Sequence, residues 1–106
     1  MMDQATIEKA VDLLLEAAPA GSKVILFGSH ARGDAGPDSD LDFLVIEPRV
    51  ADHRAEMVRL QHVMQPLPVS VDVLVTTEAV FEEWHDTPGT VLYEAAKEGR
   101  VFDAVR

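Results

Sequence analysis

The stretch from Phe27 to Val45, which reads FGSHARGDAGPDSDLDFLV, constrains the fold of this chain more than any other. An apolar run, KVILF over 23–27, leads into this stretch, and a second apolar run, LDFLVI over 41–46, begins near its end. Short apolar runs bounded by turn residues are typical of buried strands. The residues between the runs are dense in Gly, Pro and Asp, which predicts a turn that brings the chain back on itself. The Gly-Ser pair after the first run is therefore expected beside the Asp-x-Asp that opens the second.

Asp40 and Asp42 are the first candidates for chemistry. On a strand, side chains two residues apart share a face, so these carboxylates are expected side by side. Such a pair is mutually repulsive, and Mg²⁺, which prefers oxygen ligands, removes the repulsion. Two ions roughly 3.5–4 Å apart can clamp the attacking and leaving oxygens of a displacement at phosphorus. An isolated Asp-x-Asp is more often a turn cap or a solvated loop, but the flanking runs favour a metal site.

A third carboxylate, Asp72, lies within Val69–Val75 (VSVDVLV). The strict alternation of valine predicts a strand with one buried face, and Asp72 is on the opposite face. A helix predicted over Ala51–Gln65 would make this strand parallel to the second one. That pairing places Asp72 alongside the start of the second strand, where it can complete a metal site and help to deprotonate a hydroxyl.

The turn itself offers groups for binding phosphate. Gly28 lets the backbone approach a ligand closely, and Ser29 begins a predicted short helical turn whose N–H groups favour phosphate oxygens. Ser39 is a further candidate for binding the nucleotide. Arg32 can contact phosphate or a partner, but it can equally be a structural ion pair for Asp34, Asp38 or Asp40. His30 is expected at the surface.

The composite motif GSHARGDAGPDSDLDFLV resembles the signature of the DNA polymerase β-like nucleotidyltransferase superfamily, and in detail the minimal nucleotidyltransferases, or MNT proteins. The third strand and the tail VLYEAAKEGRVF are also similar to those proteins. The resemblance implies a nucleotidyltransferase fold with Gly28 and Ser29 on the triphosphate. It implies that Asp40 and Asp42 hold the metals and that Asp72 is the third carboxylate. None of the three carboxylates departs from the family pattern.

The same resemblance implies a function. MNT proteins are commonly antitoxins that neutralise a helical HEPN-domain ribonuclease by binding it and by attaching AMP from ATP to one of its tyrosines. Two alternatives stay open. One is a non-catalytic subunit that inhibits by binding alone. The other is nucleotidyl transfer to a small molecule, which the lack of a second domain for the acceptor disfavours.

The bulk composition bounds these possibilities. The 106 residues predict a single domain over 1–106, with an α/β (α+β) fold in which helices pack on a small mixed sheet. The net charge of −10, from 19 acidic and 9 basic residues, argues against direct binding of nucleic acid. The chain has no cysteine, no signal-peptide pattern and no membrane-length apolar run, which together predict a cytoplasmic protein.

The remaining elements follow from periodicity and capping. Helices are expected over Asp3–Ala18, over Glu78–Trp84 after a Thr cap, and from Pro88 to about Lys97, where Gly99 ends the last one. A short edge strand is expected over Val101–Val105. Trp84 is assigned to the core, with an exposed contact for a partner as the alternative. The helix over Ala51–Gln65 is expected to bury Ala55, Val58, Leu60, Val63 and Met64 and to expose Asp52, Arg54, Glu56 and Arg59.

Overall fold

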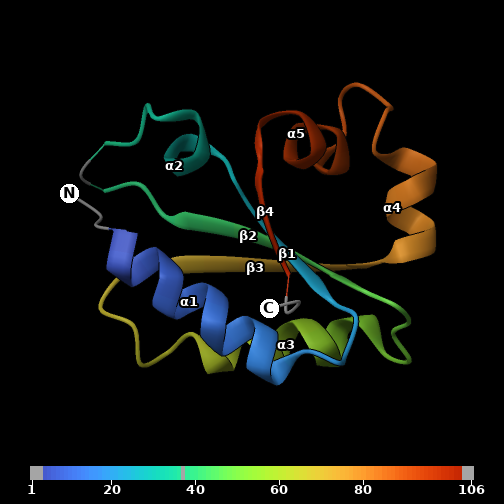
Figure 1. Ribbon diagram of the computed structural model, residues 1–106, viewed down its shortest axis with the longest axis horizontal. Coiled ribbons are helices and arrows are strands. Elements are labelled where there is room, and N and C mark those ends of the chain that lie inside the picture. The colour runs from blue at the N-terminus through green and yellow to red at the C-terminus, as the bar shows by residue number, and fades with distance from the viewer. Residues whose placement is uncertain (1–3, 37, 104–106) are drawn as a thin grey trace.

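The computed structural model describes residues 4–36 and 38–103 as a four-stranded mixed sheet with helices on both faces (Figure 1). This confirms the predicted fold class. The five helices are α1 (Gln4–Ala17), α2 (Ser29–Arg32), α3 (His53–Val63), α4 (Glu78–Trp84) and α5 (Val91–Glu98). The four strands are β1 (Lys23–Phe27), β2 (Leu41–Glu47), β3 (Val71–Thr77) and β4 (Arg100–Asp103). The last residues of the predicted edge strand, and Asp3 at the start of the first predicted helix, lie outside the described residues.

The strand order is β3-β2-β1-β4. β1 runs antiparallel to β2, as the return of the chain after α2 requires, and it is also antiparallel to β4. β2 and β3 are parallel, because α3 carries the chain back across the sheet between them. The predicted parallel pairing is therefore confirmed, and it aligns the first residues of β2 with the first residues of β3.

The two faces of the sheet bury different helices. The α1 and α3 face holds the larger core, to which β3 contributes the alternating Val71, Val73 and Val75. The opposite face holds a smaller core in which Ala95 of α5 and Phe81 of α4 pack on strand residues such as Leu44. Figure 1 shows α1 and α3 below the sheet and α2, α4 and α5 above it.

Side chains of α3 cover the outer edge of β3. The Val73 N–H donates to Oε1 of Gln61 at 3.0 Å, and Nε2 of Gln61 donates to the Val71 carbonyl. Nε2 of His53 contacts the Val75 carbonyl. An edge strand with unpaired backbone groups can pair with another chain, and here α3 occupies several of those groups.

Four predictions about side-chain burial are wrong, one of them for Ala55, which is exposed. Trp84 is 45% exposed, because α4 turns Phe81 rather than Trp84 towards the sheet. Val58 is 61% exposed, since α3 buries only the narrow stripe that contains Leu60, with Met64 just beyond its end. Glu56, expected on the solvated face, is instead half-buried beside Glu47.

Gly99 ends α5 as predicted, but not through a left-handed conformation. Its φ is −78°, which any residue can adopt. The position requires Gly because a Cβ atom there would collide with Cγ2 of Ile25 and with the Ala95 carbonyl oxygen. The close approach of α5 to β1 therefore fixes this residue.

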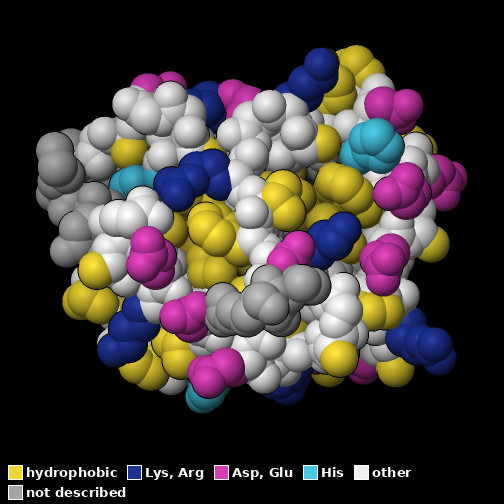
Figure 2. All heavy atoms as spheres, viewed as in Figure 1, with side chains coloured by type: hydrophobic (Ala, Val, Ile, Leu, Met, Phe, Trp, Pro, Cys, Tyr) yellow, Lys and Arg dark blue, Asp and Glu magenta, His cyan; other side chains and the backbone are white. Residues whose placement is uncertain are grey.

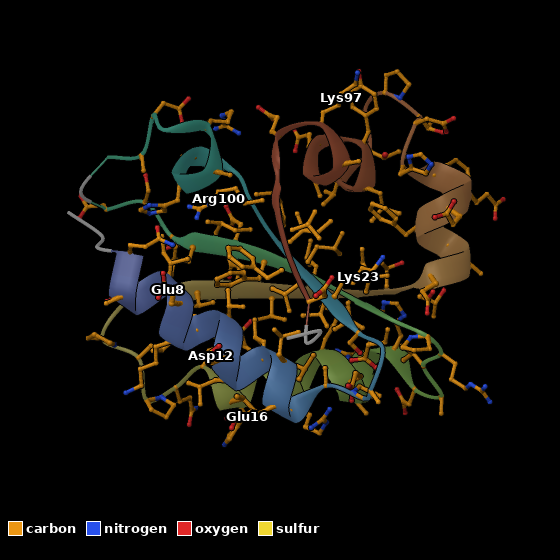
Figure 3. The ribbon with its side chains drawn as sticks, in the orientation of Figure 1. Glu8, Asp12, Glu16, Lys23, Lys97 and Arg100 are labelled. Atoms are coloured by element: carbon orange, nitrogen blue, oxygen red, sulfur yellow. The ribbon has the colours of Figure 1, made fainter. Side chains whose placement is uncertain are left out.

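The described surface is acidic. Figure 3 shows Glu8, Asp12 and Glu16 spaced one turn apart along the exposed side of α1. Figure 2 shows further carboxylates over α4, where Glu78, Glu82 and Glu83 are all exposed. None of the helices in residues 4–36 and 38–103 has both the length and the apolar character needed to cross a membrane.

Candidate active site

Asp42 and Asp72 face each other across neighbouring strands. Asp42 is the second residue of β2 and pairs in register with Asp72, the second residue of β3, and with Phe27 at the end of β1. Because side chains alternate along a strand, both carboxylates lie on the face that carries Leu44 and Leu74. The structure therefore brings these two predicted residues together.

Gly28 lies against Asp42. It follows β1 directly and has φ +80° and ψ −159°, a conformation that L side chains rarely adopt. A Cβ atom at this position would also collide with Oδ2 of Asp42. Two independent constraints therefore favour Gly at this position: the backbone conformation and the closeness of the Asp42 carboxylate.

The electrostatics identify a cluster of charges around Asp42. Burial raises the pKa of the Asp42 carboxyl, and the negative charges of Asp72 and Asp40 raise that pKa further. The nearby His30 and Arg32 act in the opposite direction and favour the ionised form. A carboxylate crowded by like charges is costly in the absence of a cation, which is the setting in which a divalent ion binds.

Asp40 lies just outside the strand. β2 begins at Leu41 rather than at Asp40, and Asp40 is exposed in the preceding loop. Within residues 4–36 and 38–103, no three His, Cys, Asp or Glu side chains are already arranged around one metal position. The chemistry of the three carboxylates nevertheless fits Mg²⁺, which prefers oxygen ligands. The negative charges of Asp40 and Asp72 raise the pKa of Asp42, and a bound cation would offset this repulsion.

The predicted short helix is present as α2. Its first turn is closed by the Gly28 carbonyl, which accepts from the N–H groups of Ala31 at 3.1 Å and Arg32 at 3.0 Å. The first N–H groups of any helix have no acceptor within the helix. Those of Ser29 and His30 are therefore available in principle to a phosphate oxygen next to Asp42.

Two other candidates have structural partners. Nε of Arg32 lies 3.3 Å from the Asp34 carboxylate and 3.7 Å from that of Glu98, and the hydrogen bond to Asp34 raises the pKa of the guanidinium. The Ser39 hydroxyl accepts from the Gly36 N–H at 2.9 Å and so closes the loop.

His30 differs from the prediction of a surface residue. It is half-buried, and its Nε2 lies 3.2 Å from the Ser39 carbonyl oxygen. The hydrogen bond ties α2 to the loop before β2, which holds Gly28 and Asp42 together.

A hollow of about 400 Å³ opens beside the two paired carboxylates. Asp42 and Asp72 line it, together with Phe27 and Leu74 from the sheet. Met57 and Gln61 from α3 complete the lining, and sequence reasoning missed both. Their place depends on how α3 packs along the β3 edge, which no local pattern in the sequence encodes.

Comparisons with known proteins identify the domain family and the fold. The family model described as a nucleotidyltransferase domain matches residues 7–102. Among solved structures, a toxin–antitoxin with AMP-PNP has a TM-score of 0.62 and 24% identity, covering 94% of this chain and 72% of that one.

Two mutant forms of the toxin–antitoxin MntA-HpeT also have TM-scores of 0.62, each at 23% identity. They cover 100% and 89% of this chain and 76% and 69% of theirs. At these identities the structural likeness shows the fold alone. None of the curated proteins matches the chain in sequence. The match over residues 7–102 shows that the chain belongs to the nucleotidyltransferase domain family.

Proposed function

We propose that this chain is a metal-dependent nucleotidyltransferase that transfers AMP from ATP to a hydroxyl group of a partner protein. The observation that carries the proposal is the register of Asp42 with Asp72, next to a Gly28 whose missing side chain leaves room for Asp42. That arrangement groups carboxylates beside a turn suited to phosphate, on a chain of the nucleotidyltransferase family.

The residues divide into two sets. Asp40, Asp42 and Asp72 would hold two Mg²⁺ ions, which when bound neutralise phosphate charge and favour ionisation of the attacking hydroxyl. Gly28 and Ser29 would bind the triphosphate through backbone N–H groups and the Ser hydroxyl. Arg32 and Ser39 lie close by, and a contact of either with the nucleotide would compete with its present hydrogen bond.

The reaction is a displacement at the α-phosphorus. The acceptor oxygen forms a bond to that phosphorus, the bond from the phosphorus to the bridging oxygen breaks, and pyrophosphate leaves. The hydroxyl proton passes to the carboxylate of Asp72 and then to water. The protein contributes mainly by holding the acceptor oxygen, the α-phosphate and the carboxylates in one geometry.

We further propose that the acceptor is a HEPN-domain toxin and that the chain acts as its antitoxin from a cytoplasmic location. The similar structures are described as toxin–antitoxin assemblies, one of them with AMP-PNP. The net charge of −10 and the exposed carboxylates of α1 favour a protein partner over nucleic acid.

The test is transfer of label from α-labelled ATP, with Mg²⁺, to the polypeptide that co-purifies with this chain. The wild type would be compared with Asp42→Asn and with Asp86→Asn, which removes an exposed carboxylate outside the site. Label is expected with the wild type and Asp86→Asn and not with Asp42→Asn. If a polypeptide co-purifies but no variant labels it with any of the four nucleotides, the chain is a binding subunit instead.

A further inference from the structure

A second hollow lies along the outer side of β3. It measures about 520 Å³ and is lined by α3 and by the connector that leads into β3. It shares Met57, Gln61 and Val73 with the smaller hollow that holds Asp42 and Asp72. The two hollows therefore form one groove, defined here as the α3–β3 groove, which ends at the paired carboxylates.

The chemistry of the α3–β3 groove differs from that of the rest of the surface. Its larger part is lined mainly by apolar side chains, among them Met57, Leu67 and Val69, and Val58 stands at its wall 61% exposed. No Asp, Glu, Lys or Arg of the described residues lines this part. On a chain with a net charge of −10, such a long uncharged groove is a feature to be explained.

The junction of the two hollows is occupied by Gln61. Its side-chain amide bonds the Val71 carbonyl and the Val73 N–H, which are backbone groups of the outer β3 edge on either side of Asp72. A side-chain amide can reproduce the hydrogen bonds of a polypeptide and can also give way to one. The floor of the groove therefore includes two backbone groups of β3 that are paired with a side-chain amide, next to the carboxylates.

We propose that the α3–β3 groove binds an uncharged, apolar stretch of the acceptor polypeptide and directs its hydroxyl-bearing residue to Asp42 and Asp72. The inference rests on the proposed function and names where its acceptor lies. Continuity with the carboxylates gives the direction of the segment. A nucleic acid does not fit, because its phosphates require cations that the larger hollow lacks.

Two variants with equal chemistry test the groove. Val58→Glu places a charge on the groove wall, and Val101→Glu places the same charge on β4, at a side chain that is 59% exposed and does not line either hollow. Neither site is buried, so both variants are expected to fold, which circular dichroism would check. With the co-purified acceptor, the KM for the acceptor should rise at least tenfold for Val58→Glu and less than twofold for Val101→Glu. The KM for ATP should not rise with the KM for the acceptor.

Association of the chain with the acceptor separates this inference from the proposed function. It would be measured between purified components, with Val58→Glu and Val101→Glu each combined with Asp42→Asn. Suppose that Val58→Glu weakens the association, that Val101→Glu does not, and that the wild type transfers no label. This result refutes the proposed activity and supports the groove as the binding site. Equal KM and equal affinity for the two variants refute the groove. A change in the sedimentation of the isolated chain with Val58→Glu would assign the groove to a second copy and would also overturn the proposal.

Discussion

Replacing Glu47 by Gln should raise the unfolding free energy relative to that of the wild type. This difference should be markedly larger at pH 8 than at pH 5. Glu47 ends β2 at the opposite end from Asp42, with 1% of its surface exposed. Burial raises the pKa of the Glu47 carboxyl to about 8, helped by the neighbouring Glu56. In the described part of the chain its Oε2 is buried without a hydrogen-bond partner. The group is therefore protonated in the folded state at neutral pH.

Glu56 remains ionised because Arg59 holds it. Two guanidinium nitrogens of Arg59 lie 2.9 and 2.7 Å from the Glu56 oxygens, and Nη2 also donates to the Ala17 carbonyl at the end of α1. These bonds, with one from Glu47, lower the pKa of Glu56 to about 2. Glu56 is thus ionised throughout the range above pH 5. Of the two carboxyl groups, only that of Glu47 changes charge in this range.

The magnitude follows from the pKa of Glu47. In the unfolded chain Glu47 ionises near its ordinary pKa of 4.5, whereas in the folded chain it keeps its proton up to about 8. Between those values the unfolded state is favoured by about 1.4 kcal/mol per pH unit. Gln has no such ionisation. From pH 5 to pH 8 the wild type should lose about 3–4 kcal/mol of unfolding free energy relative to Glu47→Gln.

Urea unfolding at pH 5, 6.5 and 8 measures this difference for the wild type, Glu47→Gln and the control Glu83→Gln, an exposed residue of α4. The free energy of Glu47→Gln minus that of the wild type should increase with pH, while the control should stay level. A difference that does not change between pH 5 and pH 8 would refute the assignment of a buried, protonated Glu47.

Three further perturbations test other parts of the structure. Gly28→Ala should lower the unfolding free energy by about 1–3 kcal/mol through its φ of +80° and its collision with Asp42, and should abolish transfer. Gly36→Ala, which meets nothing closer than 3.9 Å, is the control, and equal stability of the two would contradict the geometry. Gln61→Leu should cost about 1 kcal/mol in urea unfolding through two lost hydrogen bonds to β3, against no change for the exposed Gln65→Leu. Because the pKa of Asp42 is raised, binding of Mg²⁺ with ATP at acidic pH should release more protons from the wild type than from Asp42→Asn, seen as a difference in buffer-dependent heat in calorimetry. The same proton release from Asp42→Asn would exclude Asp42 as its source.

The sequence predicted the layout of the candidate site because local patterns encode it. The apolar run of β1 has the predicted bounds, Lys23–Phe27, and the valine alternation of β3 fixed the face of Asp72. The helix between β2 and β3 required a parallel pair, and parallel pairing with matched starts places Asp72 beside Asp42. These inferences need only strand periodicity and chain connectivity.

Predictions that depended on packing between elements were less successful. Trp84 is apolar and lies one turn from Phe81, but it is the last residue of α4 and stays exposed. α3 was expected to bury a wide apolar face, yet Val58 points away from Leu60 and forms the wall of the α3–β3 groove. Which side of a short helix meets the sheet depends on the neighbouring elements.

Polar contacts over long sequence separations were the other gap. Gln61 lies 12 positions from Val73, and Arg59 lies 42 positions from Ala17. No local pattern distinguishes these residues from a solvated helix face. The close approach of α5 to β1 at Gly99 is of the same kind, since the reason for Gly there is a collision with Ile25.

The most direct measurement is single-turnover transfer from α-labelled ATP to the co-purified acceptor by Asp42→Asn, Asp72→Asn and the double variant. If the two carboxylates act as one unit at the α-phosphorus, each single variant should lose transfer by at least a hundredfold in rate. The double variant should then be no slower than either single variant. Transfer by Asp72→Asn at the wild-type rate would contradict the pairing of Asp42 and Asp72 as the reactive centre.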